Sequence, residues 1–301
     1  MPLHCWTSAR YTVPLPAHHR FPIAKYALLR DAVIAGGLVP PGHVHEPDRA
    51  STESLRLVHT ERYIQAVLSG TLNDAEQRRI GLPWSESLVE RSFRAVGGTC
   101  EAAAAALDRG VTMNLAGGTH HAFPDHGEGF CVFNDAAVAI RTLQRDGRIR
   151  RAVVIDLDVH QGNGTHAIFA DDPSVFTFSM HGGRNYPFHK VPGSLDVELP
   201  DDTGDDDYLA ALAAALPRAL SASAPDLAVY LAGADSHEGD RLGRLGLTFE
   251  GLARRDVMVL DACREVGIPV VITIAGGYGR NIEDSVKVHL NTVRIASELS
   301  S

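Results

Sequence analysis

The stretch Ala152-Val153-Val154-Ile155-Asp156-Leu157-Asp158-Val159-His160 predicts both the class of fold and a metal site. Residues 152–157 form a short apolar run, typical of a strand that is buried on both faces. Such a strand should not end in two carboxylates and a histidine unless something compensates the charge, as a divalent cation would. Alternate side chains of an extended chain point the same way, so we expect Asp156, Asp158 and His160 to project to one side. A solvated polar strand end is the alternative, because so short a motif also occurs by chance.

Length and composition predict an ordinary globular protein. The chain has 301 residues, of which 45% are hydrophobic and 22% charged, so it can bury a large core. It contains no long Pro/Ser/Gly tract and no repeat, and we therefore expect a single domain over residues 1–301. No apolar run has the length of a signal-peptide core or of a membrane span, which indicates a cytoplasmic protein.

Charge and cysteine content narrow the classes of function. The formal net charge of −9 argues against direct nucleic-acid binding, which needs a basic surface, and favours a cationic substrate. The four cysteines lack the paired spacing of a zinc knuckle or of a disulfide framework, so we expect reduced thiols. The oligomeric state is not predicted by any of these features.

From residue 111 onward, short apolar runs alternate with longer amphipathic segments. This alternation predicts an α/β protein with a mostly parallel sheet covered by helices on both faces. The expected strands are residues 111–116, 152–157, 175–178, 227–231 and 269–275. The expected helices are residues 135–145, 164–170, 205–221, 249–266 and 281–299, with further helices near 23–35, 61–68 and 86–107.

Polar residues and glycines follow all five expected strands. They are, in strand order, His120 and His121, then Asp158 and His160, then Ser179 and His181, then Asp235, and finally Gly276, Gly277 and Tyr278. Because ligands of open α/β folds bind beyond the carboxyl ends of the strands, we expect these groups to meet at one edge of the sheet.

The residue types at this edge suggest a catalytic metal centre. Asp158, His160 and Asp235 form a three-ligand set that leaves a position open for water or substrate, as catalytic zinc sites do. Asp156 would then orient a histidine or contribute to a separate monovalent-cation site.

Two further features would supply proton transfer and oxyanion binding. His120 and His121 can act as general base or acid near neutral pH, or they are a capping or surface pair. Tyr278 would aim its phenol at an oxygen bound to the metal, whereas an isolated tyrosine after two glycines is more often a packing residue.

Five runs of sequence together resemble the histone deacetylase family and keep its motif order over most of the chain. They are Gly117-Gly118-Thr119-His120-His121-Ala122, Gly129-Phe130-Cys131-Val132-Phe133-Asn134-Asp135, Asp156-Leu157-Asp158-Val159-His160-Gln161-Gly162-Asn163-Gly164, Leu231-Ala232-Gly233-Ala234-Asp235 and Gly276-Gly277-Tyr278. The resemblance implies the arginase-like fold, with three α/β/α layers, and one catalytic zinc ion. The chain is most similar to class IV members, because Asn163 stands where classes I and II usually carry aspartate.

The resemblance also implies roles for individual residues. The zinc ligands would be Asp158, His160 and Asp235. The catalytic residues would be His120 with its partner Asp156, His121 with its partner Asn163, and the transition-state tyrosine Tyr278. The substrate tunnel would be lined by Gly129, Phe130, Tyr186 and Gly277, with the alignment loosest at Tyr186. A structural K⁺ site would use Asp156, Asp158, His160, Ser179 and Met180.

The activity implied is removal of an acyl group, acetyl or longer fatty acyl, from the Nε atom of lysine by metal-activated water. The substrate would be an acyl-lysine protein or peptide. An acetylpolyamine or another acylated small amine is an alternative on the same fold, and a non-catalytic acyl-lysine binding protein is a third. A paired-manganese arginase is not expected, because Asp158-Val159-His160-Gln161-Gly162 lacks the D-x-H-x-D pattern. The same ligands would also accept Fe²⁺ or another divalent ion.

Overall fold

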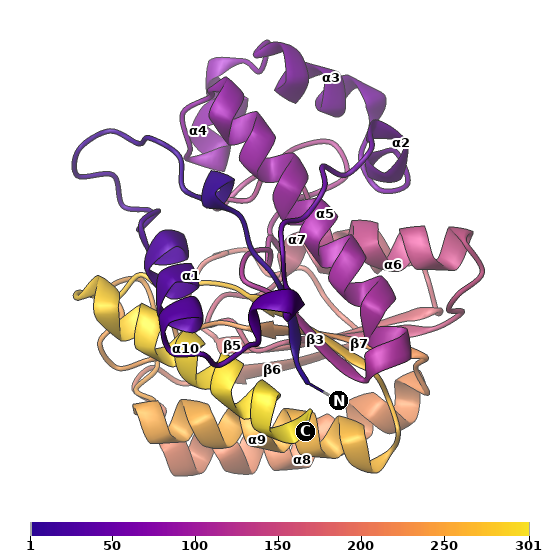
Figure 1. Ribbon diagram of the computed structural model, residues 1–301, viewed down its shortest axis with the longest axis vertical. Helices are drawn as coiled ribbons and strands as arrows, with labels where there is room; N and C mark the ends of the chain where they lie inside the picture. The colour runs from indigo at the N-terminus through magenta and orange to yellow at the C-terminus, as the bar shows by residue number, and fades with distance from the viewer. Residues whose placement is uncertain (1, 301) are drawn as a thin grey trace.

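The computed structural model describes residues 2–300, and a single parallel sheet forms its centre (Figure 1). Its eight strands are β1 (His4–Trp6), β2 (Val44–His45), β3 (Val111–Asn114), β4 (Ala152–Asp156), β5 (Val175–Gly182), β6 (Leu195–Leu199), β7 (Leu227–Ala232) and β8 (Val270–Ile274). Their order is β2-β1-β3-β8-β7-β4-β5-β6, and every neighbouring pair is parallel.

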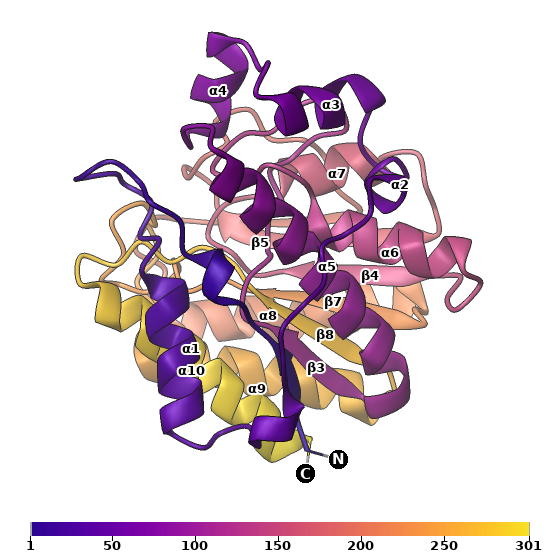
Figure 2. The same cartoon turned by 45° about the horizontal axis from the view of Figure 1, so that its top comes forward.

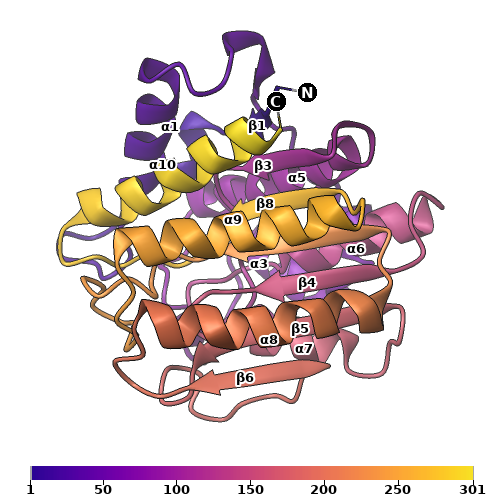
Figure 3. The ribbon, with the colours of Figure 1, turned by 90° about the horizontal axis from the view of Figure 1, so that it is seen from below.

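Helices cover both faces of the sheet, so the expected α/β/α fold is confirmed (Figure 3). One face carries α8 (Asp205–Ser223), α9 (Phe249–Glu265) and α10 (Ile282–Leu299), with α1 (Lys25–Ala35) packed on α10. The other face carries α5 (Glu86–Arg109), α6 (Asp135–Arg145) and α7 (Asn163–Phe169). The short helices α2 (Thr52–Leu55), α3 (Glu61–Ser69) and α4 (Asp74–Ile80) lie beyond α5, far from α8 and α9 (Figures 1 and 2). Two 3-10 turns, Ala9–Tyr11 and Pro41–His43, complete the described elements.

The side chains of β4 enter two different hydrophobic clusters. Val153 and Ile155 pack in the cluster that contains the leucines of α8, whereas Ala152 and Val154 pack in the cluster that contains the alanines of α5 and α6. All five side chains of the strand are buried. Burial on both faces explains why this run is continuously apolar and not alternating.

Several short elements were not expected from the sequence. β1 and β2 have three and two residues, too few for a periodic pattern, and β6 is a partly exposed edge strand. The short helices α2 and α4 were also missed. The cysteines are free, as expected. None of the helices in residues 2–300 combines the length and the apolar character needed to cross a membrane.

Candidate active site

The carboxyl ends of the central strands bring the three expected metal ligands together. Asp158 and His160 follow β4, and Asp235 follows β7, which pairs with β4. One ligand atom from each residue lies within 4.8 Å of the other two, and all three side chains are buried. His160 Nδ1 lies 2.9 Å from Asp158 Oδ1 and 3.2 Å from Asp235 Oδ2. The three residues therefore form one compact cluster.

The backbone reaches this cluster by a bend and not by the extended course that the sequence suggested. β4 ends at Asp156, whose Oδ1 accepts a hydrogen bond from the Asp158 N–H at 3.2 Å. Asp158 Oδ1 in turn accepts one from the His160 N–H at 2.9 Å. A carboxylate that binds the N–H two residues further on closes a local turn. The strand therefore ends at Asp156 and does not continue in extended form to His160. Asp156 and Asp158 nevertheless both lie against His120, as expected for side chains on one side, and Asp158 and His160 meet.

The cluster fits a divalent cation. Asp235 Oδ2 is buried and makes no hydrogen bond of good geometry within residues 2–300. Burial and the charge of Asp158 raise the pKa of Asp235 to about 7, because two buried carboxylates lack sufficient compensating charge. A divalent cation would supply that charge, and the oxygen and nitrogen donors suit Zn²⁺ or a related ion.

Gly276 makes room for the cluster. Its N–H donates to Asp158 Oδ2 at 2.6 Å, and a Cβ at this position would overlap Asp235 Oδ2. Glycine is thus required by the close approach of the backbone to both carboxylates.

A buried arginine contacts the two segments that carry Asp158 and Asp235. Arg255 of α9 is fully buried, and its Nη1 donates to the carbonyl oxygens of Gly233 at 2.6 Å and Leu157 at 3.4 Å. Its charge is balanced by Asp256, whose Oδ1 accepts from Arg255 Nε at 2.9 Å. Arg255 was not predicted from the sequence. The charged pair Arg255-Asp256 within the amphipathic run 249–266 was the signal that could have indicated it.

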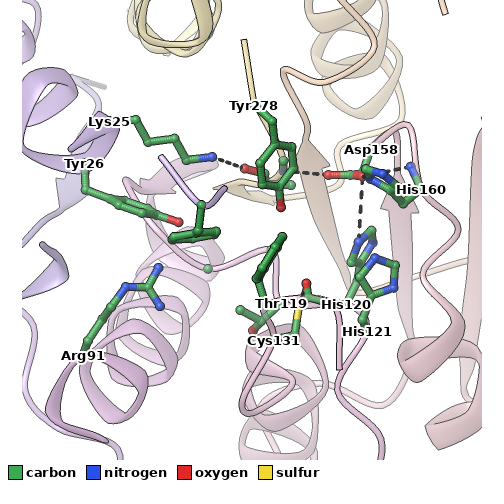
Figure 4. A pocket seen from close by; sticks show the side chains of 17 residues that line it. Lys25, Tyr26, Arg91, Thr119, His120, His121, Cys131, Asp158, His160 and Tyr278 are labelled. Atoms are coloured by element: carbon green, nitrogen blue, oxygen red, sulfur yellow. Dashed lines mark hydrogen bonds and ion pairs between the residues drawn. The ribbon is translucent and has the colours of Figure 1, made fainter. Parts of the chain in front are cut away.

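His120 has a carboxylate as its partner. Its Nδ1–H donates to Asp156 Oδ2 at 2.6 Å. Its Nε2 lies 3.8 Å from Asp158 Oδ1 (Figure 4). Burial lowers the pKa of His120, but the charges of Asp156 and Asp158 outweigh burial and raise the pKa to about 9. The predicted pairing of Asp156 with the first histidine is present in the structure.

His121 has an amide as its partner, as expected from the sequence, and the amide is held by a further acid. The His121 Nδ1–H donates to Asn163 Oδ1 at 2.7 Å, and Asn163 Nδ2 donates to Glu128 Oε1 at 2.6 Å. The Tyr186 hydroxyl donates to the same oxygen at 2.7 Å. Burial, together with the charges of His120 and His160, lowers the pKa of His121 well below its usual value. Glu128 was not predicted, although it directly precedes Gly129 and Phe130, which were expected to line the substrate tunnel.

A cleft of about 560 Å³ opens onto these residues. Its lining includes Gly129, Phe130, Tyr186 and Tyr278 together with His121 and His160. The Tyr186 ring stands edge-on to the His121 ring at 5.0 Å, and Phe130 lies 5.8 Å from Tyr278, between ring centroids. Gly277 differs from the expectation: a Cβ there would meet Ala234 and Ser285, away from the cleft.

A second, inner cavity of about 30 Å³ shares His121, His160 and Tyr278 with the cleft (Figure 4). Tyr278, His120, His121 and His160 contribute to it, with Lys25 and Arg91 at its far end. Both cations are buried, and Lys25 Nζ donates to the Ala275 carbonyl at 2.9 Å. A cavity that holds one water molecule offers about 10–15 Å³, so this cavity has room for only a few small groups.

The residues expected for K⁺ lie on β4 and β5 and the bend after β4. Asp156 and Ser179 are register partners, and Met180 is buried beside Ser179. Ser179 Oγ lies 2.9 Å from His181 Nδ1. The K⁺ site stays a prediction.

Known proteins are similar to this chain in sequence and in fold. The histone deacetylase domain matches residues 19–293. An uncharacterized protein of Picosynechococcus sp. is 48% identical over 96% of each chain. Histone deacetylase 2 of Arabidopsis thaliana is 33% identical over 89% of this chain and 73% of its own. The crystal structure of an HDAC homolog from Aquifex aeolicus superimposes with a TM-score of 0.85 at 26% identity, over 100% of this chain and 84% of that one.

Proposed function

We propose that this chain, which belongs to the histone deacetylase family, removes acetyl or another short acyl group from the Nε atom of lysine in peptides or proteins. Membership of this family indicates a hydrolase that acts on amides. The observation that carries the proposal is the meeting, within one buried site, of a ligand triad, two differently partnered histidines and a tyrosine at the foot of an open cleft. We propose Zn²⁺ as the metal, and the amide partner Asn163 supports placement in class IV.

Asp158, His160 and Asp235 would hold the cation, which when bound polarises the amide carbonyl and makes water more acidic. His121 is the proton acceptor, because its Nδ1–H is engaged by Asn163 and its Nε2 is left free. The Tyr278 hydroxyl would donate to the oxyanion as it develops. His120, with a carboxylate behind it, would carry positive charge beside the reacting amide, and His121 would return its proton to the departing amine.

The inner cavity supports a short acyl group. It offers about 30 Å³, which suits acetyl and leaves no space for a long fatty chain without movement of its lining. Removal of a long fatty acyl group, which the resemblance to the family also allowed, is therefore less favoured than removal of acetyl.

The lining of the cleft also bears on the small-molecule alternative. Arginine side chains surround the cleft, and no Asp or Glu among residues 2–300 lines it. An acylated polyamine is polycationic and would be repelled there. This local charge reverses the preference for a cationic substrate that the net charge of the chain suggested.

Activity on defined substrates tests the proposal. The metal content of the protein is measured, and kcat/KM is compared for acetyl, butyryl, octanoyl and myristoyl groups on one lysine peptide, with acetylspermidine alongside. We expect acetyl-lysine to be the best substrate. Faster hydrolysis of acetylspermidine would favour the small-amine alternative, and binding of the acyl peptide without turnover would favour the binding-protein alternative.

Tyr278→Phe provides the matched test of the site. It keeps the ring in the cleft wall but removes the hydroxyl, so metal content should be unchanged while turnover falls on the order of 10²-fold or more. Near-normal turnover would remove Tyr278 from the mechanism.

A further inference from the structure

Arginines gather around the mouth of the cleft although the chain as a whole is acidic, with a net charge of −9. The cleft-lining arginines come from four separate segments and are Arg20, Arg78, Arg79, Arg184, Arg241 and Arg244. All of them are exposed. Within residues 2–300, no carboxylate lines the same cleft. The local charge of the entrance is thus opposite to that of the protein.

Most of these cations are available to a ligand. Arg184 and Arg244 share one carboxylate, Asp201, at 3.2 Å and 3.1 Å. The other four arginines have no carboxylate oxygen within 4.0 Å in the described part of the chain. A structural role in surface ion pairs therefore does not account for them.

Backbone contacts fix the arginine-bearing segments to the cleft wall. The Gly129 N–H donates to the Arg79 carbonyl at 3.1 Å, and the Phe130 N–H donates to the Ile80 carbonyl at 2.7 Å, so the end of α4 is joined to the wall. Arg241 Nε donates to the Tyr278 carbonyl at 2.9 Å. The end of α4 and Arg241 are therefore held at the entrance by residues that line it.

We propose that this entrance selects acyl-lysines that are flanked by acidic residues in a peptide or protein, an inference that rests on the proposed deacylase function. The acyl group would point to the inner cavity, whereas the residues on either side of the lysine would lie at the mouth. Cations at the mouth consequently recognise the carrier of the lysine and not the acyl chain. Because the arginines come from four segments, they match several carboxylates spread over a peptide better than one small anion. Phe188, with 82% of its surface exposed next to Tyr186, adds an apolar contact for the peptide.

A peptide series tests the charge preference on the metal-loaded protein. The peptides share one acetyl-lysine and one length and carry Asp/Glu, Ser/Gln or Lys/Arg at the flanking positions. We expect kcat/KM to be on the order of 10-fold higher for the acidic than for the basic peptide, mainly through KM, with the ratio shrinking as salt is added. Equal rates, or faster hydrolysis of the basic peptide, would overturn the inference. So would equal kcat/KM for free Nε-acetyl-lysine and the acidic peptide.

Charge-removing variants locate the preference. Arg78→Gln combined with Arg79→Gln should reduce the acidic-over-basic ratio several-fold, and since both residues also lie in the last turn of α4, Arg20→Gln serves as an independent variant. The matched control combines Arg218→Gln with Arg294→Gln, which removes the same charge from exposed positions on α8 and α10. An equal reduction in the control would mean that net charge, and not the entrance, sets the preference.

Binding separates this inference from the proposed function. Fluorescence anisotropy with labelled forms of the same peptides measures charge preference without turnover. If no acetyl-lysine peptide is hydrolysed but the acidic one binds most tightly, the proposed function fails and the charged entrance stands. If peptides are hydrolysed without charge preference in rate or binding, the function stands and the entrance inference fails.

Discussion

The two adjacent histidines of the site differ in the group behind each ring. His120 donates to the carboxylate of Asp156, and His121 donates to the amide of Asn163, at nearly equal distances of 2.6 Å and 2.7 Å. Their exposed fractions are also nearly equal, 3% and 4%, so burial does not separate them. Their neighbours do: the pKa of His120 is raised to about 9, and that of His121 is lowered well below its usual value. The surroundings thus shift the pKa values of two identical side chains in opposite directions.

The difference is one of distance as well as of chemistry. A carboxylate also stands behind His121, but it is Glu128, on the far side of the Asn163 amide. Asn163 therefore transmits a fixed orientation to His121 without placing a charge against its ring. This arrangement suits a residue that must accept a proton, whereas the direct carboxylate suits one that stays protonated.

The largest expected effect comes from removing the rings themselves. His121→Ala should lower kcat by about 10²- to 10⁴-fold, because the proposed proton acceptor is lost. His120→Ala should lower it less. Steady-state kinetics at equal metal content checks both, and a larger loss at His120 would reverse the roles assigned to the two residues.

The next largest effect on the rate is expected when His120, like His121, has an amide as its hydrogen-bond partner. Asp156→Asn removes the charge that raises the pKa of His120, so the pKa falls and the protonated form is lost at lower pH. The basic limb of the pH profile of kcat/KM should move to lower pH, with a loss of about 10- to 100-fold at neutral pH. An unshifted basic limb would mean that His120 titration does not limit the rate.

Giving His121 a carboxylate partner, as His120 has, needs two substitutions. Asn163→Asp alone would place a second carboxylate against Glu128, which now lies 2.6 Å from the Asn163 amide. Asn163→Asp combined with Glu128→Gln avoids that repulsion. In this double variant the carboxylate should raise the pKa of His121, so the acid limb of kcat/KM moves to higher pH.

Glu128→Gln alone is the control for that experiment, since it keeps an acceptor for Asn163 and leaves the amide next to His121. If the double variant and this control have the same pH profile, the partner of His121 does not set its pKa.

The smallest expected effect concerns the far end of the same hydrogen-bond chain. Tyr186→Phe keeps the ring in the cleft wall and removes only the hydroxyl that donates to Glu128. The lost hydrogen bond is worth about 1 kcal/mol, so we expect roughly a 5-fold loss in kcat/KM. Measured rates at several pH values check this. A loss as large as that of His121→Ala would show that Tyr186 contacts the reacting groups directly.

The sequence predicted the central strands, because each is a short apolar run, and it predicted the cluster of Asp158, His160 and Asp235, because these residues follow such runs. Residues after parallel strands must meet at one edge, so Asp158, His160 and Asp235 were brought together by topology alone. The bend at Asp158 was not predicted, because its carboxylate competes with the strand for backbone N–H groups. Such competition is invisible to an apolar pattern.

The features that were missed arise from contacts between distant segments. Glu128 reaches Asn163 across a separation of 35 residues, and nothing in the local sequence specifies that bond. The arginines of the cleft come from segments between residues 20 and 244, so their common charge emerges only when the chain is folded. Net charge, which averages over the whole surface, indicated the opposite sign.

Arg255 has a consequence for mutational screens. A variant such as Arg255→Leu would leave the buried Asp256 without its cation and would free the carbonyl oxygens of Leu157 and Gly233, which lie one and two residues before the proposed metal ligands Asp158 and Asp235. Breaking a buried ion pair in this way costs about 3–5 kcal/mol of stability, a large part of what a folded domain possesses. Inactive clones from a random library would therefore include positions on α9 that never meet substrate, and thermal unfolding would be needed to tell loss of the folded state from loss of chemistry.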